Sequence, residues 1–414
     1  MALTTFTGDG GWCWFQDPRA LRHEGEHDRT YAGWITRHGD IQVGRYDHDD
    51  GSLAATTLHP EYEPDDHDDP TFAVRPDGRL VVFYTLHGGP EVNYRISEAP
   101  EDVDAFGPER TIEPGGPDRS VTYPNPRWID GDLHLFLRND GGGVGRVVCV
   151  VSEDGGETWG DQRELLTTGG EGWCIYHKLS RARDGEVHMG LTHAMGGANE
   201  PHRNLHHARF DGTALRASDG TLLGRIEDDS LPVHFEETTS VFDSDAAGDD
   251  AWIWDCSTAG GQPQVAYAQL VSETDHRYRY ARWDGEAWHD ELLCHGGSHI
   301  VAGEGNRETY YSGGVVLDHD EPGVCYASIG SHDSSALLRF ERIGDGDGAS
   351  AWRRTTIADA DTQNVRPMAP WNGHPDLRVC WLRGAYTHFA PEFSEDEGAA
   401  YRTAVVGGTG DGGE

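Results

Sequence analysis

Residues 152–159 read Ser152-Glu153-Asp154-Gly155-Gly156-Glu157-Thr158-Trp159. This run matches the Asp-box turn, Ser-x-Asp-x-Gly-x-Thr-Trp, in which the aspartate caps a hairpin turn and the tryptophan packs between strands. Such a turn marks a blade of a β-propeller and carries no information about a reaction. The stretch therefore predicts an all-β chain built from propeller blades.

The pattern of short β-type runs and Asp-Gly turns continues on both sides of this motif, without any amphipathic helical pattern of ten or more residues. Similar polar or proline-containing segments precede strands at intervals of mostly about 50 to 62 residues, near Asp17, His67, Tyr123, Tyr176, Glu237, Tyr311 and Arg366. This repeat predicts a seven-bladed β-propeller of four-stranded antiparallel blades. We expect one domain over residues 1–414, closed by pairing of the N- and C-terminal strands, with a short disordered tail from about 404 to 414.

Charge excludes nucleic acid as a partner. The chain has 33 Lys and Arg against 72 Asp and Glu, which gives a formal net charge of -39. A nucleic-acid-binding protein carries the opposite sign. Lys178 is the only lysine in the chain. An acid-rich, nearly lysine-free composition is typical of proteins that stay soluble in very high salt, where screening removes self-repulsion, so we expect a high-salt environment.

The N-terminal residues 1–10 contain no basic start followed by an apolar stretch, and no apolar run of 18 residues occurs. We therefore expect no membrane segment, and a cytoplasmic location unless a leader has been removed. Seven cysteines without CxxC spacing favour buried thiols in a reducing interior over a disulfide scaffold. We expect a monomer.

Two histidines flank a predicted β-hairpin. The apolar runs 71–74 and 80–87 are joined by a Pro76-Asp77-Gly78 turn, with His67 before the first run and His87 at the end of the second. In an antiparallel hairpin these two outer ends lie side by side, so we expect both imidazoles at one rim. The alternative is that both are surface polar residues, since histidine titrates near neutral pH without any role.

In a propeller the innermost strands all begin at one face. This places a set of polar and aromatic side chains around one mouth, which comprises Gln16, Asp17, His67, Tyr123, Tyr176, His177, Lys178, Tyr311 and Arg366. Lys178 stands out because this composition disfavours lysine elsewhere, so it is a candidate for substrate binding. Chance survival of one lysine is the alternative.

With these residues assembled, the chain resembles the BNR-repeat β-propellers that include the ulvan lyases, enzymes that cut a sulfated, uronate-containing rhamnan by β-elimination. The resemblance covers nearly the whole chain and rests on the segments 11–20, 65–70, 122–126, 136–139, 251–255 and 364–367. It implies that His67 and Tyr123 flank the scissile bond and that His87 and Arg138 hold the uronate carboxylate. Tyr176 would complete the subsite. The substrate would be an acidic polysaccharide or oligosaccharide.

Elimination from a uronate needs a base for the C5 proton, a cation at the C6 carboxylate and an acid for the leaving oxygen at C4. Arg138 suits the carboxylate because its planar fork forms two bonds and keeps its charge. Tyr123 could donate to O4 and, if ionised by positive surroundings, also act as the base, with His67 as the rival base. The alternatives are an Arg138 paired with a surface aspartate and a Tyr123 that only packs in a turn.

A second hairpin carries several histidines. His193 and His206 could face each other across it and, with a further ligand, bind a structural zinc, as the resemblance implies. Alternating histidines on an exposed strand give the same pattern. We expect no cofactor for the chemistry itself, with a structural zinc or calcium as an open possibility.

Three other functions compete with the lyase. A sialidase-like hydrolase needs an arginine triad, for which Arg19, Arg277 and Arg366 with Tyr311 are available, although Arg19 lacks the usual sialidase motif. An α-L-rhamnosidase would also use a histidine-centred site. A non-catalytic carbohydrate-binding propeller would stack Trp12, Trp14 and Trp254 on its ligand. Only the lyase makes a 4,5-unsaturated uronate.

Overall fold

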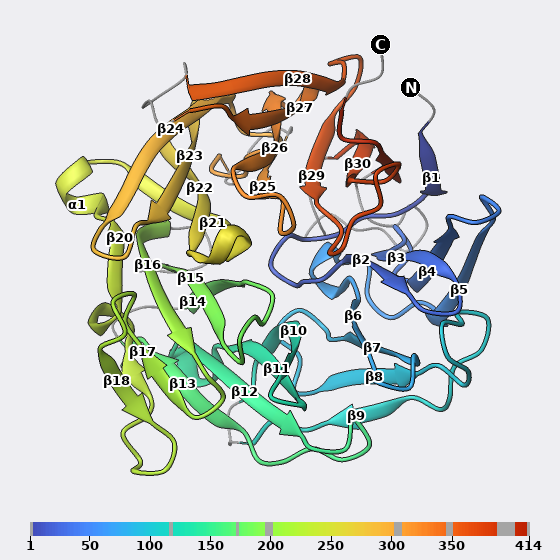
Figure 1. Cartoon of the computed structure of the whole chain (residues 1–414), viewed down its shortest axis with the longest axis horizontal. Coiled ribbons are helices and arrows are strands. Elements are labelled where there is room, and N and C mark those ends of the chain that lie inside the picture. Colours follow the sequence, from blue (N-terminus) through green and yellow to red (C-terminus); the bar gives the residue numbers. More distant parts are fainter. Residues whose placement is uncertain are drawn as a thin grey trace.

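The computed structural model describes residues 3–115, 119–170, 174–194, 202–301, 309–344, 351–386 and 402–411. Almost all regular structure in these ranges is β-strand, and the sheets are set around a common centre like the blades of a propeller (Figure 1). The helical pieces are single turns: η1 (Asp66–Asp68), η2 (Gly141–Gly143), η3 (Phe235–Glu237), α1 (Ser244–Ala247) and η4 (Ala259–Gly261). The predicted all-β class is confirmed.

The described strands form six sheets. Two are four-stranded antiparallel meanders. The first consists of β2 (Ala20–Glu24), β3 (Asp28–Ile35), β4 (Ile41–Asp47) and β5 (Leu53–His59). The second consists of β6 (Thr71–Val74), β7 (Leu80–Tyr84), β8 (Val92–Ile96) and β9 (Arg110–Ile112). The third contains β10 (Val121–Ile129), β11 (Asp132–Asn139), β12 (Arg146–Ser152) and β13 (Arg163–Thr167), with the short β19 (Val233–His234) added in parallel.

The fourth sheet contains β14 (Cys174–Leu179), β15 (Val187–Ala194), β16 (His202–Phe210), β17 (Ala214–Arg216) and β18 (Leu222–Arg225), with β20 (Thr239–Phe242) paired to β16. The fifth sheet has eight strands in two antiparallel runs. The first run is β21 (Asp250–Ser257), β22 (Gln264–Ser272), β23 (Asp275–Trp283) and β24 (Trp288–Gly297), and the second is β25 (Val315–Leu317), β26 (Val324–Gly330), β27 (Ser335–Arg342) and β28 (Trp352–Ala358). Among the described residues, the strand pairing between the two runs consists of the single pair Gly297 and Gly330.

The two ends of the chain share the sixth sheet. Its strand order is β1 (Thr4–Thr7), β31 (Arg402–Gly408), β30 (Val379–Ala385) and β29 (Asn364–Met368), and Thr4 lies opposite Gly407. The first and last strands of the chain accordingly lie side by side (Figure 1). The tail expected from about 404 is corrected, because residues 404–408 belong to β31, where Val405 and Val406 are buried.

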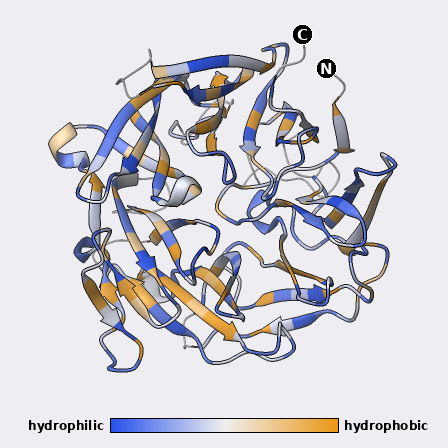
Figure 2. Ribbon diagram, viewed as in Figure 1, coloured by the Kyte–Doolittle hydropathy of each residue, from blue (hydrophilic) through white to orange (hydrophobic). Residues whose placement is uncertain are grey.

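The core lies between neighbouring sheets, in clusters of buried apolar side chains from their strands, and both hydrophobic and hydrophilic residues occur along the ribbons (Figure 2). At the 152–159 turn, the Asp154 carboxylate accepts hydrogen bonds from the backbone N–H groups of Glu157 and Thr158 at 3.0 and 2.9 Å. Trp159 follows the turn and packs against Phe83 and Tyr94 of the preceding sheet. The turn thus connects two neighbouring sheets.

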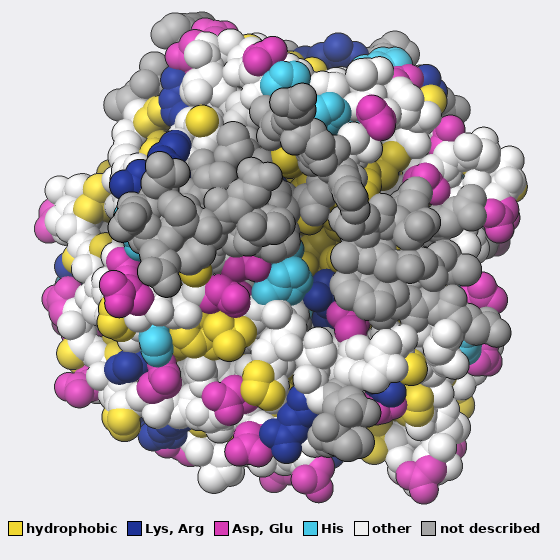
Figure 3. Space-filling model, turned by 180° about the vertical axis from the view of Figure 1, so that it is seen from behind, with side chains coloured by type: hydrophobic (Ala, Val, Ile, Leu, Met, Phe, Trp, Pro, Cys, Tyr) yellow, Lys and Arg dark blue, Asp and Glu magenta, His cyan; other side chains and the backbone are white. Residues whose placement is uncertain are grey.

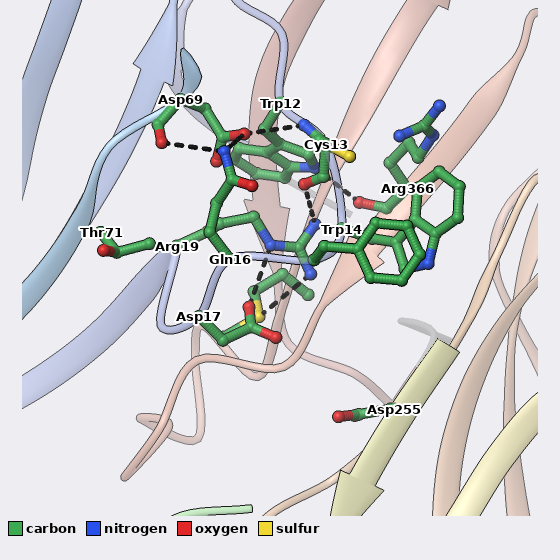
Figure 4. Close-up of polar contacts among 12 residues, drawn as sticks. Trp12, Cys13, Trp14, Gln16, Asp17, Arg19, Asp69, Thr71, Asp255 and Arg366 are labelled. Carbon is green, nitrogen blue, oxygen red and sulfur yellow. Dashed lines mark hydrogen bonds and ion pairs between the residues drawn. The ribbon is translucent and has the colours of Figure 1, made fainter. Parts of the chain in front are cut away.

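The centre of the molecule is filled by the segment of residues 11–17, between β1 and β2, which we call the central segment. Trp12, Trp14 and Phe15 are at most 1% exposed. The Trp12 indole donates to the Arg366 carbonyl on β29 at 2.8 Å (Figure 4). The Trp14 indole donates to the Ile253 carbonyl on β21 at 3.1 Å. The aromatic run in the sequence is therefore a core that holds the inner strands together.

Candidate active site

His67 and His87 form a stacked pair. Their ring centroids are 4.1 Å apart and their planes differ by 6°. Asp65 bridges them, with its Oδ1 2.5 Å from Nδ1 of His67 and its Oδ2 3.1 Å from Nδ1 of His87. His67 lies in η1, before β6, and His87 follows β7. The hairpin prediction that both imidazoles meet at one rim is confirmed.

The carboxylate gives the two imidazoles different charges. Burial alone would lower the pKa of His67, but the negative charge of Asp65 outweighs it and holds that pKa well above the ordinary value. Burial, helped by the neighbouring His67 cation, lowers the pKa of His87 to about 4. Burial would raise the pKa of Asp65, yet the two imidazoles keep it far below its usual range. At neutral pH the pair therefore holds one cationic and one neutral ring.

Tyr123, Arg138 and Tyr176 lie beside this pair. The Tyr123 ring is 5.8 Å from that of His67 and 6.2 Å from that of Tyr176. The Arg138 guanidinium covers both phenol rings, at 4.6 Å from Tyr123 and 5.1 Å from Tyr176. The five predicted residues thus meet at one place, although they come from separate parts of the chain. They lie in η1, after β7, and on β10, β11 and β14. Seen from behind, the middle of the molecule is hollowed, with histidine, basic, acidic and hydrophobic side chains around the hollow (Figure 3).

The backbone at Tyr123 explains how a strand residue turns toward the centre. Tyr123 has φ +62, and the pairing of β10 with β11 is irregular between Thr122 and Asn125. Arg366 on β29 repeats this with φ +54 and an irregularity between Val365 and Met368. Each is followed by a proline, a residue that strands accept at bulges. The left-handed conformation costs about 1 to 3 kcal/mol for a non-glycine residue, so the surrounding packing must hold it in place.

Arg138 is buried and paired with a buried carboxylate. Its Nε lies 2.7 Å from Oδ2 of Asp140, and the two side chains are 2% and 5% exposed. The alternative of a surface partner for Arg138 is therefore wrong. Burial raises the pKa of Asp140 to about 6 although Arg138 opposes the shift. Sequence reasoning missed Asp140, whose signal was its place two residues after Arg138 at the end of the same strand.

The pKa of Tyr123 is also raised well above 10, because burial outweighs the opposing charge of Arg138. A positively surrounded phenolate was the condition for Tyr123 to act as a base, and that condition is not met. Tyr123 keeps its proton at neutral pH.

Arg366 and Tyr311 lie on another side of the central segment. The Arg366 guanidinium is 4.3 Å from the Trp14 ring and 5.5 Å from the Tyr311 ring. It donates to the Tyr386 hydroxyl at 2.7 Å, and that hydroxyl donates to Asp66 at 2.5 Å. Because Asp66 also lies 3.2 Å from Nδ1 of His67, a polar chain connects this group to the imidazole pair.

Lys178 and His177 do not line the mouth. Lys178 is 1% exposed, and its ammonium binds the Trp14 carbonyl and the Asp17 carboxylate. The substrate-binding prediction for Lys178 is corrected, because its charge is used up in holding the central segment. His177 points to the opposite face of β14, the face that carries Ile175 and Leu179 in the hydrophobic cluster between sheets. Burial lowers the pKa of His177 to about 3, so it stays neutral there.

His193 and His206 lie on neighbouring strands but face an aromatic ring. Their rings are 4.5 and 4.4 Å from that of Phe235, and His206 Nδ1 lies 3.1 Å from the Thr238 hydroxyl. Within the described ranges, no third histidine, cysteine or carboxylate completes a metal site with them. The described residues hold one group with metal-ligand spacing, Asp65 with His67 and His87. Its atoms already bind one another.

The sites of two rival functions, the sialidase and the carbohydrate-binding propeller, are not assembled. Arg277 on β23 pairs with Asp275 at 2.6 Å, away from Arg366, and Arg19 binds Asp17 and the Cys13 carbonyl. The arginine triad of a sialidase is therefore not formed. Trp12, Trp14 and Trp254 are at most 1% exposed, so none offers a face to a ligand. Among the residues with described positions, no helix is long and apolar enough to cross a membrane.

Comparison with known proteins gives a family and a fold. The model of the BNR repeat-containing family matches residues 29–294. No curated protein sequence matches the chain. A polysaccharide lyase of family PL25, an ulvan lyase bound to -[GlcA(1-4)Rha3S]-, is 15% identical, with a TM-score of 0.74 over 99% of this chain and 97% of that one. The polysaccharide lyase Uly1 is 12% identical, with a TM-score of 0.61 and 98% of both chains covered. At these identities the likeness establishes the β-propeller fold.

Proposed function

The chain belongs to the BNR repeat-containing family, and from this premise we propose that it is a polysaccharide lyase that cleaves an ulvan-like, rhamnose- and uronate-containing glycan by β-elimination. One observation carries the proposal. A carboxylate-bridged imidazole pair, a protonated phenol and a buried guanidinium meet at one place in the fold. These are the groups that elimination from a uronate requires.

His87 is the base in this scheme. It is neutral at pH 7, Asp65 holds its Nδ1, and its side chain is 28% exposed, against 5% for His67 and 2% for Arg138. His67 is already protonated, so its positive charge favours the substrate carboxylate instead of accepting a proton. Asp65 fixes the orientation of both rings.

Tyr123 is the acid, and Arg138 binds the C6 carboxylate. The raised pKa of Tyr123 keeps its proton available for the leaving oxygen. Asp140 holds Nε of Arg138 and so sets the direction of the guanidinium fork. In the reaction His87 takes the C5 proton, the C5–H electron pair forms the C4=C5 double bond, and the C4–O bond breaks. Tyr123 then protonates the departing oxygen.

Activity screening on ulvan and other polyuronates in molar salt tests the proposal. The expected result is an ultraviolet absorbance from the 4,5-unsaturated uronate, together with one new reducing end per cut. New reducing ends without that absorbance would identify a hydrolase and reject the lyase. The absence of both signals on every polyuronate would reject an enzyme for these substrates and favour a binding protein.

Substitutions at the site assign the roles. Tyr123→Phe and His87→Ala should each lower kcat by about 10²- to 10⁴-fold, the usual contribution of a proton-transfer group. His289→Ala is the matched control, because that imidazole is 52% exposed and pairs with Asp284 in a turn. Undiminished turnover in Tyr123→Phe would remove the phenol from the mechanism.

We also count the two antiparallel runs of the eight-stranded sheet as separate blades, since one residue pair joins them. This count gives seven blades in one domain. The acidic composition supports a high-salt environment for this enzyme.

A further inference from the structure

A cavity of about 230 Å³ lies at the opposite ends of the first strands of several blades from the candidate active site. On β10, Tyr123 is near the start and the cavity residue Trp128 is near the end. Strands rise about 3.3 Å per residue, so roughly 16 Å separates these two positions. Likewise Tyr176 precedes Arg181 along the chain from β14, and Arg366 precedes Trp371 from β29. The cavity is therefore separate from the imidazole pair.

The charge of this cavity is opposite to that of the protein. Its described lining contains Arg22, Arg127, Arg181 and His23, and neither aspartate nor glutamate. The whole chain carries a formal net charge of -39. Two other cavities mix both signs of charge. One has Asp184, Glu186 and Asp219 beside Arg183 and Arg209, and the other has Asp290 and Glu291 beside Arg279, Arg282 and Arg342. A local surplus of guanidinium groups favours an anionic ligand here.

Arg127 is a cation whose hydrogen bonds go to backbone carbonyls and not to carboxylates. Its guanidinium donates to the carbonyls of Ser180, Asp17, Pro126 and Leu179 at 2.7 to 2.9 Å. Burial lowers its pKa to about 9, while the charges of Asp17 and Asp255 act in the opposite direction. Arg22 and Arg181 are instead paired, with Asp28 and Asp320, at the edge of the cavity.

Trp371 forms a fixed aromatic wall. Its N–H donates to the Ala20 carbonyl at 3.3 Å and its carbonyl accepts from the N–H of Arg22 at 2.8 Å, so its backbone is paired with β2. The Arg127 guanidinium lies 4.5 Å from its ring. Trp128, the second indole in the lining, donates to the Val74 carbonyl at 2.9 Å. Rigid aromatic walls with a few directed polar groups are the usual make-up of a small-molecule site.

We propose that this cavity binds a sugar residue that carries a carboxylate or sulfate group, as a second glycan-binding site on the face opposite the candidate active site. The sugar ring packs against Trp371, and the anionic group meets the guanidinium groups. The volume suits one sugar residue and lies below the range for drug-sized ligands. This inference goes beyond the proposed function, since it does not depend on elimination at the imidazole pair.

Fluorine NMR on protein labelled with fluorotryptophan tests the site without interference from the mouth. The Trp371 resonance is identified by its loss in Trp371→Phe and followed during titration with glucuronate, glucose and inorganic sulfate. We expect glucuronate to shift it at lower concentration than glucose or sulfate. An equal response to glucose would reject the anionic requirement. An equal response to inorganic sulfate would reject the sugar, and no response to glucuronate would reject the site.

The variant Asn372→Asp sharpens this test. Asn372 lines the cavity with φ +58, a conformation that aspartate tolerates, and its Oδ1 already accepts from Arg181 at 2.8 Å. The added charge should weaken glucuronate binding about tenfold or more, which corresponds to about 1.4 kcal/mol. The control Asn204→Asp makes the same change at φ +55 on β16, outside the cavity, and should bind as the parent does.

Elimination activity on a short uronate substrate should be equal in the parent and Asn372→Asp. Activity without the Trp371 response would reject only the second site, and the response without activity would reject only the lyase. Unchanged glucuronate binding in Asn372→Asp would show that the anion does not sit among these guanidinium groups.

Discussion

The two histidine pairs of this protein have the same local origin and different chemistry. His67 and His87 are brought together by one hairpin, and His193 and His206 by the pairing of β15 with β16. At the first pair Asp65 lies between the rings, so one imidazole is held cationic. At the second, Phe235 packs on both rings, and burial lowers the pKa of His206 to about 4. The Asp65 carboxylate overcomes the effect of burial at one imidazole, His67, whereas beside Phe235 burial keeps His206 neutral.

The largest expected effect comes from removing that carboxylate. Asp65→Asn should lower kcat by about 10²- to 10⁴-fold, because neither imidazole keeps its orientation and His67 loses its charge. An NMR titration should show the pKa of His67 falling in this variant, since only burial and weaker partners remain. Asp284→Asn, in an exposed turn, is the control and should be as active as the parent. If His67 titrated as before, the bridge would not be the source of its charge.

Lys178 is a second buried cation with a carboxylate partner, and it tests what such a pair contributes to stability. Its partner is Asp17, and its ammonium also binds the Trp14 carbonyl, so we expect it to hold the central segment in place. Lys178→Met should lower the free energy of unfolding by about 3 to 5 kcal/mol, because Asp17 would be left buried without its cation. Urea unfolding measures the change. The double variant Lys178→Met with Asp17→Asn should recover part of it, and equal losses in both variants would contradict this reading.

The uncharged pair predicts a pH dependence. The folded pKa of His206 is about 4 and the unfolded one is about 6.5, so below 6.5 the unfolded chain binds more protons. His206 therefore makes the fold less stable as the pH falls from 6.5 to 4, by up to about 3 kcal/mol. His206→Leu should reduce that slope while the stability at pH 7 changes little. Denaturant unfolding at several pH values measures this slope of stability against pH. An unchanged slope in His206→Leu would assign the acid sensitivity to other buried imidazoles.

Salt should have the smallest effect on either pair. In molar salt the screening length falls to about 3 Å, which weakens interactions among exposed charges but not those within buried contacts. We expect the pKa of His67 to differ by less than about half a unit between 0.2 and 2 M KCl, whereas the urea midpoint of the whole protein should rise as self-repulsion is screened. A large salt response of His67 in an NMR titration would show that solvent reaches the pair.

Sequence reasoning worked where the structure is local. The hairpin at 71–87 brought His67 and His87 together, because its turn and its two apolar runs allow a single register between the strands. It also placed Tyr123 and Tyr176 at the same mouth, since each begins a predicted innermost strand, whereas Arg138 was implied by the family resemblance. It failed for Lys178, which it assigned to the mouth. The binding-protein alternative, in which Trp12 and Trp14 would stack on a ligand, fails as well, because both indoles are buried.

These failures have one physical reason. By itself the sequence determined the strand and turn pattern, the acidic composition and contacts of short reach, such as His67 with His87, which are 20 residues apart. Tertiary structure decided what is buried. Lys178 meets Asp17 across 161 residues, and Trp12 meets Arg366 across 354. Burial depends on everything that packs around a group, so a residue's own stretch of chain does not reveal whether its charge or its ring faces a ligand or fills the centre of the fold.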